Sequence, residues 1–495
     1  MKMGLTRLWL IISLLLVVSC SKASPDLHTS GQNKKSALSG QITAFRHVNL
    51  VPMTVERIFE NQTVLVEGTR ITAFGPTNEV AIPEDAKVID GAGAYLMPGL
   101  ADMHMHTRED WLNGPWPVSP LKLYLANGVT TIRDFGPRGR SLTYVLRWRD
   151  EINAGNLVGP TLYTSGLRPG HPSAGPVQDP QKIVRENKAQ GFDFLKLYSF
   201  LSKEEFHQAM TTAKQLDMYT TGHIPFSVGL DGVLAEGMDE IAHIEELDFE
   251  FLDFDRGKNL QPQEWFSYII DAAVQQYRAS FGLSTAELKE RYGETISVTV
   301  NKLRSANVPI CTTMAVGEII VEKLFKTEAF LARPENKYLP RWYMEAFRQG
   351  KEKHQVQFRG NEDLAPFKYA LERLLLTASK QAGILLLLST DSGSGGMGIV
   401  PGFSIHDELR ILTENGFTPY EAIATGTTNA SKVVAAMTGE DDFGTIEVGK
   451  RADLILLNGN PLEDVNNIQG ILGLMAAGRW YGKAELQEMI AISGQ

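Results

Sequence analysis

Cysteine is nearly absent from this 495-residue sequence, and so are long hydrophobic runs. The two cysteines are Cys20 and Cys311, so at most one disulfide could form within the chain. The apolar run from Leu8 to Val18 has eleven residues, which is too short for a helix that crosses a bilayer of roughly 30 Å. The sequence therefore excludes a fold held together by several disulfides, and it excludes a membrane-spanning helix formed by the run from Leu8 to Val18.

An excess of positive charge is also missing, because 48 Lys and Arg stand against 58 Asp and Glu and give a net charge of −10. The net negative charge repels the phosphates of nucleic acids, so we expect no nucleic-acid partner. Hydrophobic residues make up 43% and charged residues 21%, which is ordinary for a folded enzyme and excludes a mainly disordered chain. The length exceeds what one hydrophobic core usually organises, so we expect one large and one small domain.

The N-terminus has the pattern of a secretion signal. Lys2 and Arg7 precede the short apolar run, and Val17-Val18-Ser19-Cys20 resembles the lipobox of bacterial lipoproteins. In a lipobox the cysteine becomes the lipidated first residue of the mature protein. A plain signal peptide that contains Cys20 is the alternative. Ser21 favours the outer membrane over the inner membrane, so we expect an exported, lipid-anchored protein of the outer membrane or periplasm.

The first forty residues are therefore excluded from the fold. Residues 1–20 are assigned to the signal peptide with its lipobox. Residues 21–40 contain Ser, Lys and Asn with little apolar content, which is typical of a flexible tether. Once Cys20 is lipidated, Cys311 has no disulfide partner, so stability must come from the core and from bound metal.

Short alternating strands mark both ends of the remaining chain. Runs such as Thr63–Val66 are broken by turn signals such as Gly75-Pro76, which is typical of strands joined by turns. Gly444–Leu457 has the same pattern. We therefore predict that residues 41–95 and 440–485 meet in one small β-sandwich domain.

Residues 96–439 alternate strand-like and helical stretches, as βα units around a parallel sheet do. The eight candidate strands are Tyr95–His106, Val129–Phe135, Thr161–Ser165, Phe194–Tyr198, Tyr219–His223, Glu240–His243, Val308–Thr313 and Ile384–Asp391. They predict an α/β fold, a (β/α)8 TIM barrel, with the β-sandwich domain built from both chain ends. Long charged stretches after the sixth and seventh strands, including Glu318–Ala382, predict helical insertions over the barrel mouth.

Metal-competent side chains end five of these strands. They are His104, His106, Lys196, His223, His243 and Asp391. His104 and His106 are two apart on a strand, so both project to the same side. The carboxyl ends of the strands meet at one face of such a barrel, so we expect the six groups to converge. Lys196 follows apolar residues, where a neutral amine could react with carbon dioxide to give a carbamate that bridges two metals.

With these residues the sequence resembles the amidohydrolase superfamily. Within it, the similarity is to the branch of imidazolonepropionase-like proteins and metal-dependent dipeptidases of the Xaa-Pro type. Supporting motifs are Pro98-Gly99-Leu100 before the histidine pair, Gly128–Asp134 on the second strand, Ala424-Thr425 and Gly449–Leu454. The resemblance extends over residues 41–482.

The resemblance implies a site for two divalent metal ions. It makes His104, His106 and Asp391 ligands of the more buried metal, His223 and His243 ligands of the other, and Lys196 the carbamylated bridge. Imidazoles and carboxylates suit zinc, whereas manganese, cobalt and iron stay open from ligand type. A one-metal site would need no bridge, and Lys196 would then be ion-paired.

The implied reaction is acyl transfer to water by a metal-activated hydroxide, with Asp391 moving the proton. The branch favours a C–N bond in a dipeptide, an N-acyl amino acid or a cyclic amide, although esters and lactones use the same chemistry. Arg168, His171 and Tyr198 are candidate anchors for a substrate carboxylate. The alternatives are a mononuclear deaminase or cyclic-amide hydrolase, and a non-catalytic, metal-bearing binding lipoprotein. Expected partners are a small-molecule or peptide substrate and the membrane, while a homo-oligomer stays open.

Overall fold

The computed structural model describes residues 40–171, 179–393 and 397–492. These residues belong to one compact unit. The predicted signal peptide, its lipobox at Cys20 and all of the tether except Gly40 lie outside the described residues. Within the described ranges, no helix combines the length and the apolar character needed to cross a membrane.

Both ends of the described chain join in one mixed, eight-stranded sheet. Its strands are β1 (Ile42–Leu50), β2 (Phe59–Glu67), β3 (Arg70–Pro76), β4 (Lys87–Asp90), β5 (Tyr95–Pro98), β14 (Leu454–Leu457), β15 (Ile471–Ala476) and β16 (Arg479–Gly482). The order is β16-β15-β14-β5-β1-β2-β3, with β4 paired to β1. β5 and β14 run antiparallel, with Leu454 opposite Pro98. The two ends thus share a sheet, while the second layer of a β-sandwich stays a prediction.

The eight-stranded sheet has its own hydrophobic cluster. Phe45, Val64, Leu96, Leu454 and Met475 are fully buried in it. Side chains alternate between the faces of a strand, so the alternating sequence runs turn one face toward this cluster. Burying each such side chain stabilises the fold by about 1.5–3 kcal/mol. The cluster draws on both chain ends, so it holds them together.

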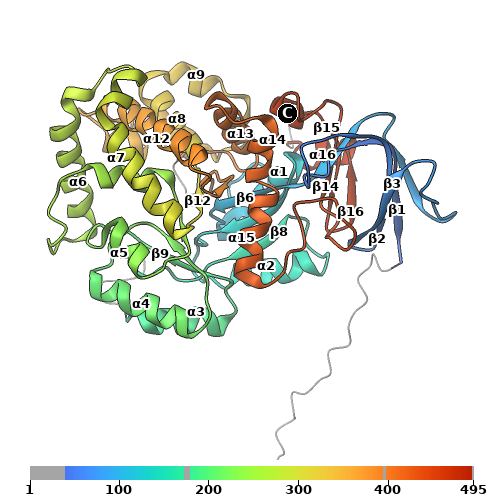
Figure 1. Cartoon of the computed structure of the whole chain (residues 1–495), viewed down its shortest axis with the longest axis horizontal. Coiled ribbons are helices and arrows are strands. Elements are labelled where there is room, and N and C mark those ends of the chain that lie inside the picture. The colour runs from blue at the N-terminus through green and yellow to red at the C-terminus, as the bar shows by residue number, and fades with distance from the viewer. Residues whose placement is uncertain (1–39, 172–178, 394–396, 493–495) are drawn as a thin grey trace, which may run out of the picture. The chain divides into compact units, whose positions relative to one another are not determined.

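Eight parallel strands form the centre of the larger part of the molecule (Figure 1). They are β6 (Leu100–Met105), β7 (Val129–Asp134), β8 (Thr161–Thr164), β9 (Leu195–Leu197), β10 (Thr220–Gly222), β11 (Glu240–Ile241), β12 (Ile310–Cys311) and β13 (Leu386–Leu387). β6 to β8 make one sheet and β9 to β13 another, both in chain order. Single parallel bridges, Ser165 to Phe194 and Met105 to Ser392, connect the two sheets at both edges. The described strands therefore have a TIM-barrel-like arrangement without a continuous ladder all the way round.

The first predicted strand, Tyr95–His106, is divided into two by Gly99. β5 belongs to the mixed sheet and β6 to the parallel strands, so the single-strand prediction was wrong. Gly99 packs so closely on Thr130 that an added Cβ would lie 2.2 Å from the Thr130 hydroxyl oxygen. Its N–H donates to the carbonyl of Asp453, away from the parallel ladder. Glycine permits this close backbone approach, and the chain changes sheets there.

Helices surround the parallel strands (Figure 1). The α-helices are α1 (Pro120–Ala126), α2 (Tyr144–Asn153), α3 (Pro180–Gln190), α4 (Lys203–Gln215), α5 (Gly229–Ala235), α6 (Pro262–Tyr277), α7 (Thr285–Ala306), α8 (Met314–Phe325), α9 (Thr327–Ala332), α10 (Arg341–Arg348), α11 (Lys353–Gln357), α12 (Leu364–Gln381), α13 (Ser404–Glu414), α14 (Pro419–Thr425), α15 (Thr428–Thr438) and α16 (Lys483–Met489). Short 3-10 helices are η1 (Glu109–Trp111), η3 (Ile244–Phe251), η4 (Arg278–Ser280), η5 (Pro334–Tyr338) and η6 (Val465–Gln469). The stretches after β11 and β12 are helical, with η3 to α7 after the former and α8 to α12 after the latter.

A buried ion pair connects the two parallel sheets. Arg133 on β7 donates to both carboxylate oxygens of Glu240 on β11. The guanidinium also lies over the rings of Phe135 and Phe194, at 4.7 and 5.5 Å from their centroids. A bidentate, buried pair of this kind fixes geometry strongly, because removal of either partner leaves an uncompensated charge. It sets the spacing between strands that a backbone ladder does not join.

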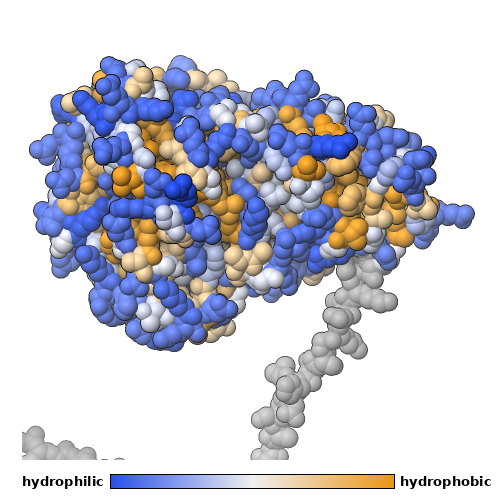
Figure 2. Space-filling view, viewed as in Figure 1, coloured by the Kyte–Doolittle hydropathy of each residue, from blue (hydrophilic) through white to orange (hydrophobic). Residues whose placement is uncertain are grey.

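Hydrophobic residues reach the surface in separate patches. On the face shown in Figure 2, these patches lie between hydrophilic residues. Large apolar side chains that are exposed include Phe266 on α6, Val298 on α7 and Trp342 on α10. Scattered exposure of this kind is normal for a folded domain, so none of these side chains marks a site by itself.

Candidate metal centre

His104 and His106 stand at the carboxyl end of β6, and each ring is fixed by a main-chain carbonyl. Nδ1 of His104 lies 2.9 Å from the carbonyl oxygen of Ala242, and Nδ1 of His106 lies 3.0 Å from that of Gly136. A carbonyl can only accept, so both Nδ1 atoms carry the hydrogen. Both Nε2 atoms are therefore left as acceptors, the form in which imidazole binds a metal.

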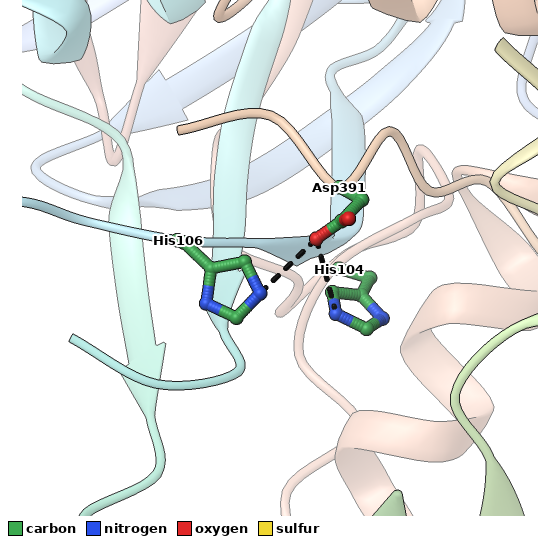
Figure 3. Close-up of side chains that lie close together, drawn as sticks. All are labelled: His104, His106 and Asp391. Carbon is green, nitrogen blue, oxygen red and sulfur yellow. Dashed lines mark ion pairs between the residues drawn. The ribbon is translucent and has the colours of Figure 1, made fainter. Parts of the chain in front are cut away.

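Asp391 faces the Nε2 atoms of these two histidines (Figure 3). Its Oδ1 lies 3.1 Å from Nε2 of His106 and 3.6 Å from Nε2 of His104. The donor atoms of the three residues all lie within 4.8 Å of one another. In the described part of the chain, this is the group of histidine and carboxylate donors that could hold a metal ion.

The loop after β13 holds Asp391 in place. Its backbone is left-handed, with φ 54°, and its N–H donates to the carbonyl of His104 at 2.7 Å. Thr390 donates to the buried carboxylate of Asp102 from its N–H at 3.1 Å and from its hydroxyl at 2.5 Å. Left-handed backbone at a non-glycine residue is strained and persists where surrounding contacts determine it. The side chain is thereby aimed at the histidines.

Charges around Asp391 favour its anionic form. Burial alone raises its pKa, but the contact with His106 and the charges of Arg138 and of His106 and His243 in their protonated forms bring the pKa well below its usual range. Burial lowers the pKa of His106 to about 4, despite the opposing effect of Asp391. At neutral pH the site therefore combines neutral imidazoles with a carboxylate, which is the donor chemistry of zinc.

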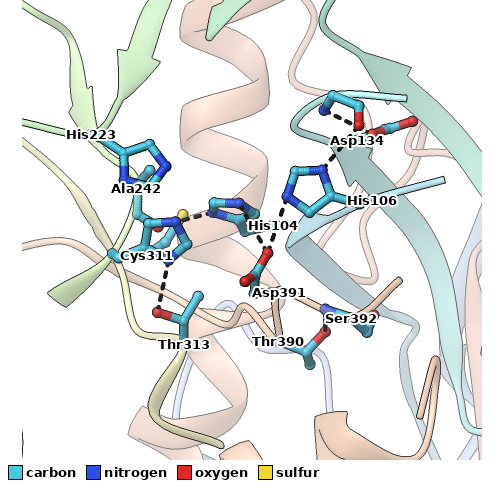
Figure 4. Close-up of polar contacts among 12 residues, drawn as sticks. His104, His106, Asp134, His223, Ala242, Cys311, Thr313, Thr390, Asp391 and Ser392 are labelled. Carbon is cyan, nitrogen blue, oxygen red and sulfur yellow. Dashed lines mark hydrogen bonds and ion pairs between the residues drawn. The ribbon is translucent and has the colours of Figure 1, made fainter. Parts of the chain in front are cut away.

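His223 and His243 follow β10 and β11 and lie beside the first cluster. Figure 4 shows His223 in one view with His104, His106 and Asp391. The His243 ring centroid is 4.3 Å from that of His104 and 4.9 Å from that of His223. Nδ1 of His223 lies 2.5 Å from Oε1 of Glu246, and Nδ1 of His243 lies 3.2 Å from the Thr313 hydroxyl. Burial, and after it the charge of Lys196, lowers the pKa of both histidines far below the usual value.

Lys196 on β9 is buried beneath the histidines. It is 1% exposed, and its Nζ lies 4.7 Å from the centroid of the Phe135 ring. Among the described residues Nζ has no hydrogen-bond partner. Burial lowers its pKa to about 7, so a neutral amine is readily reached near neutral pH. Lys196 was predicted as a metal ligand in carbamylated form, and that role stays a prediction.

The site fits the metal ions that the sequence implies. Nε2 of His104, like Nζ of Lys196, is a buried polar atom without a hydrogen-bond partner in the described chain. Buried polar atoms are normally paired, and atoms that ligate a metal are the usual exception. Two of the unpartnered buried atoms in the described chain thus belong to predicted metal ligands.

The predicted substrate anchors lie at one side of this centre. Tyr198 stacks edge-on against His223 at 4.3 Å and against His171 at 4.5 Å between ring centroids. Tyr198 and Arg168 line a cavity of about 300 Å³ together with His106, His223, His243 and Asp391. His171 contacts this wall through Tyr198. The structure thus brings all three near the metal centre, while their roles stay predictions.

Arg138 is a cavity residue that the sequence analysis missed. It follows β7, lines the same cavity as Arg168, and its buried Nε has no hydrogen-bond partner among the described residues. Burial, and then the charge of Arg138, lowers the pKa of Arg168 to about 10. Two guanidiniums at one cavity offer hydrogen-bond donors that suit an anion. Its position in Phe135-Gly136-Pro137-Arg138, just past a barrel strand, was the available signal.

Glu246 and Thr313 were also missed. Both orient a histidine through Nδ1, and Glu246 also accepts from the N–H of Ile224 at 2.9 Å. Outer-shell partners of this kind fix the tautomer and raise the basicity of a metal-ligating histidine. Glu246 lies three residues beyond His243, within the short helix η3, where no strand periodicity pointed to it.

Parallel strands with helices around them, and histidines and a carboxylate at the strand ends, form a candidate metal site of the kind found at the carboxyl end of a TIM-barrel-like fold. Residues 363–481 match the model of the amidohydrolase family. This chain therefore carries an amidohydrolase family domain.

Solved structures with the same fold cover most of the chain. A putative prolidase from Bifidobacterium longum has a TM-score of 0.61 and 21% identity, over 91% of this chain and 98% of that chain. A Xaa-Pro dipeptidase with methionine in its active site has a TM-score of 0.60 and 18% identity, over 89% of this chain and 100% of that chain. At these identities the likeness concerns the fold, which is the TIM-barrel-like α/β fold of amidohydrolases.

Similar stretches in curated proteins are short. Adenine deaminase of Staphylothermus marinus is 35% identical over 88 residues, which are 17% of this chain and 14% of that protein. Imidazolonepropionase of Pseudomonas savastanoi pv. phaseolicola is 37% identical over 67 residues, 13% of this chain and 17% of that protein. The matched stretches thus span less than a fifth of each of these two relatives.

Proposed function

We propose that this protein is a metal-dependent amidohydrolase that cleaves the C–N bond of a small substrate, such as a dipeptide or an N-acyl amino acid. The cluster of His104, His106 and Asp391 carries the proposal, because it combines neutral imidazoles with a carboxylate at the strand ends. His223, His243 and Lys196 would complete a site for two cations, of which zinc suits the donors best. Carbamylation of Lys196 is part of this proposal.

Bound cations would supply a water molecule that is nucleophilic near neutral pH, and would polarise the substrate carbonyl. Asp391, anionic at neutral pH, accepts a proton from the attacking water and passes it to the leaving nitrogen. Arg138 and Arg168 offer paired donors to a substrate carboxylate, and the Tyr198 hydroxyl can donate to the same end of the substrate.

A mononuclear deaminase or cyclic-amide hydrolase is the second candidate. It is favoured by the observation that the donor atoms of His104, His106 and Asp391 lie within 4.8 Å of one another, which suffices for one ion. The stretch similar to adenine deaminase points the same way. A non-catalytic, metal-bearing binding lipoprotein is the third candidate. It predicts metal binding without turnover.

Metal content and turnover separate these candidates. The purified mature chain is loaded with zinc, its metal per chain is measured, and it is assayed on dipeptides, N-acyl amino acids, cyclic amides and aminopurines. We expect two metals per chain and release of the amine product from an open-chain amide. One metal with release of ammonia would favour the deaminase. Metal binding without turnover of any compound would contradict an enzyme.

The proposal extends to the organisation and location of the chain. We infer a closed (β/α)8 barrel over residues 96–439, a β-sandwich from 41–95 and 440–485, and export with a lipid on Cys20. The lipobox-like Val17–Cys20 segment supports export. In bacterial cells, Cys20→Ser should move the protein from the membrane fraction to an unprocessed or freely exported form. Unchanged membrane association would contradict the lipid anchor.

A further inference from the structure

Three carboxylates gather around one ammonium in the wall of the same cavity. Glu245 and Asp248 come from η3 and Glu372 comes from α12, and all three line the cavity together with Lys368. Nζ of Lys368 lies 3.6 Å from Glu245, 3.4 Å from Asp248 and 3.7 Å from Glu372. We call Glu245, Asp248 and Glu372 the acidic group. One ammonium is shared among three carboxyl groups, so the group can accept a second cation when its buried carboxyls ionise.

Asp248 is the member of the acidic group that most needs a further partner. It is 3% exposed, and neither of its carboxylate oxygens accepts a hydrogen bond in the described chain. Burial is the main reason that the pKa of Glu372 rises to about 7 and that the pKa of Asp248 is raised strongly. A buried carboxylate without hydrogen bonds is costly, and a cation that enters the cavity would lower that cost.

The acidic group and the arginine pair line one cavity, so the cavity offers carboxyl groups at one place and guanidiniums at another. Arg138 and Arg168 belong to the loops after β7 and β8, whereas Glu245 follows His243 by two residues and lies in η3. The metal-centre residues line the cavity as well. Its remaining wall is largely apolar, with Phe226, Phe249, Leu252, Ile269, Phe358 and Leu364. Such a cavity suits a small ligand with an apolar middle and charged ends.

We propose that the cavity selects substrates that carry a carboxylate and, at a separate position, a fixed positive charge such as an ammonium or guanidinium. The acidic group receives the cation, and Arg138 with Arg168 receives the carboxylate. A divalent metal ion is a poorer occupant of the acidic group, because the Lys368 ammonium already lies among the carboxylates and would repel it. The inference names the substrate class of the proposed function and rests on it for the reaction, but binding can be tested alone.

Binding of paired ligands without an amide bond tests the inference. A short series of ω-aminoalkanoates is compared with ω-hydroxyalkanoates of the same chain length, so that each pair differs in the charge at one end. Affinities are measured by calorimetry on the zinc-loaded mature chain. We expect the best aminoalkanoate to bind at least about tenfold tighter than its hydroxy partner. Equal affinity throughout the series would overturn the inference.

Variants assign the effect to the acidic group. Glu372→Gln and Asp248→Asn should each weaken the aminoalkanoate about tenfold and leave the hydroxyalkanoate unchanged. Glu372→Asp, which keeps the charge, should restore part of the preference. Glu440→Gln, an exposed carboxylate outside the cavity, is the matched control. Equal weakening of both ligands, or a metal equivalent lost from Glu372→Gln, would contradict a cation-selecting role.

The outcomes are separable from those of the proposed function. A charge preference in binding together with no turnover of any amide would contradict the enzyme and leave the ligand class standing. Turnover with no preference for cationic substrates would contradict the proposed ligand class and support the enzyme. Thermal melting of each variant identifies a variant that fails to fold. If Glu372→Gln or Asp248→Asn fails to fold, the binding data of the other variant test the role of the acidic group.

Discussion

The two histidines of β6 are held by the backbone, whereas the two histidines that follow β10 and β11 are held by side chains. His104 and His106 donate from Nδ1 to main-chain carbonyls. His223 and His243 instead contact Glu246 and Thr313. The position of a main-chain hydrogen-bond partner is set by the fold, whereas a side-chain partner can be replaced by substitution while the fold is kept. The first half of the centre is therefore preorganised, and the second half depends on a few exchangeable residues.

Asp391→Asn should lower the catalytic rate more than any other change, because it removes the carboxylate proposed to move the proton. Asp391 belongs to the preorganised half of the centre. We expect kcat to fall by at least about a hundredfold with folding retained. Steady-state kinetics on the best amide substrate measures the change, and Asp363→Asn, an exposed residue before α12, is the control. Near-wild-type kcat would remove Asp391 from proton transfer.

Lys196→Met tests whether Lys196 forms the predicted bridge between the two metals. Methionine fills a similar volume without an amine, so the buried packing on Phe135 is kept. We expect metal content to fall from two ions to one and activity to fall by about ten- to a hundredfold. Elemental analysis and kinetics on the same preparation measure both. Two retained ions with full activity would show that Lys196 does not bridge.

Glu246→Gln changes only the partner of His223. The short contact to Nδ1 becomes a neutral one, so the affinity for the metal that His223 and His243 would hold should drop about ten- to a hundredfold. Competition with a chelator measures that affinity. Thr313→Val, which removes the longer contact to His243, should have a smaller effect. An equal effect of the two variants would contradict a special role for the carboxylate.

Glu408→Gln should have the smallest effect of these variants. It concerns how the free energy of unfolding depends on pH. Glu408 accepts from the N–H groups of Met314 and Ala315 beside Thr313, and burial raises its pKa from 4.5 to about 8. The folded state thus keeps a proton that the unfolded state has lost, so the free energy of unfolding should fall as pH rises through this window. We expect Glu408→Gln to reduce that fall by about 1–3 kcal/mol in denaturant titrations. An unchanged pH profile would contradict the raised pKa.

Residues at the ends of strands could be predicted from the sequence. Buried parallel strands are apolar runs of limited length, so polar residues within or shortly after them, such as His104, Lys196 and Asp391, stand out. The change of sheet at Gly99 could not be predicted, because it depends on the close approach of Thr130. Arg138 and Glu246 lie in loops and a 3-10 helix, where no periodicity shows which way a side chain points. The acidic group joins η3 to α12 across more than a hundred residues, which only the tertiary fold reveals.

The central claim is that six side chains from both halves hold two cations. Anomalous diffraction from crystals of the zinc-loaded protein tests it most directly. The account predicts two anomalous peaks, one beside His104, His106 and Asp391 and the other beside His223 and His243, with added density on Nζ of Lys196 between them. A single peak, or a second peak away from these residues, would contradict it.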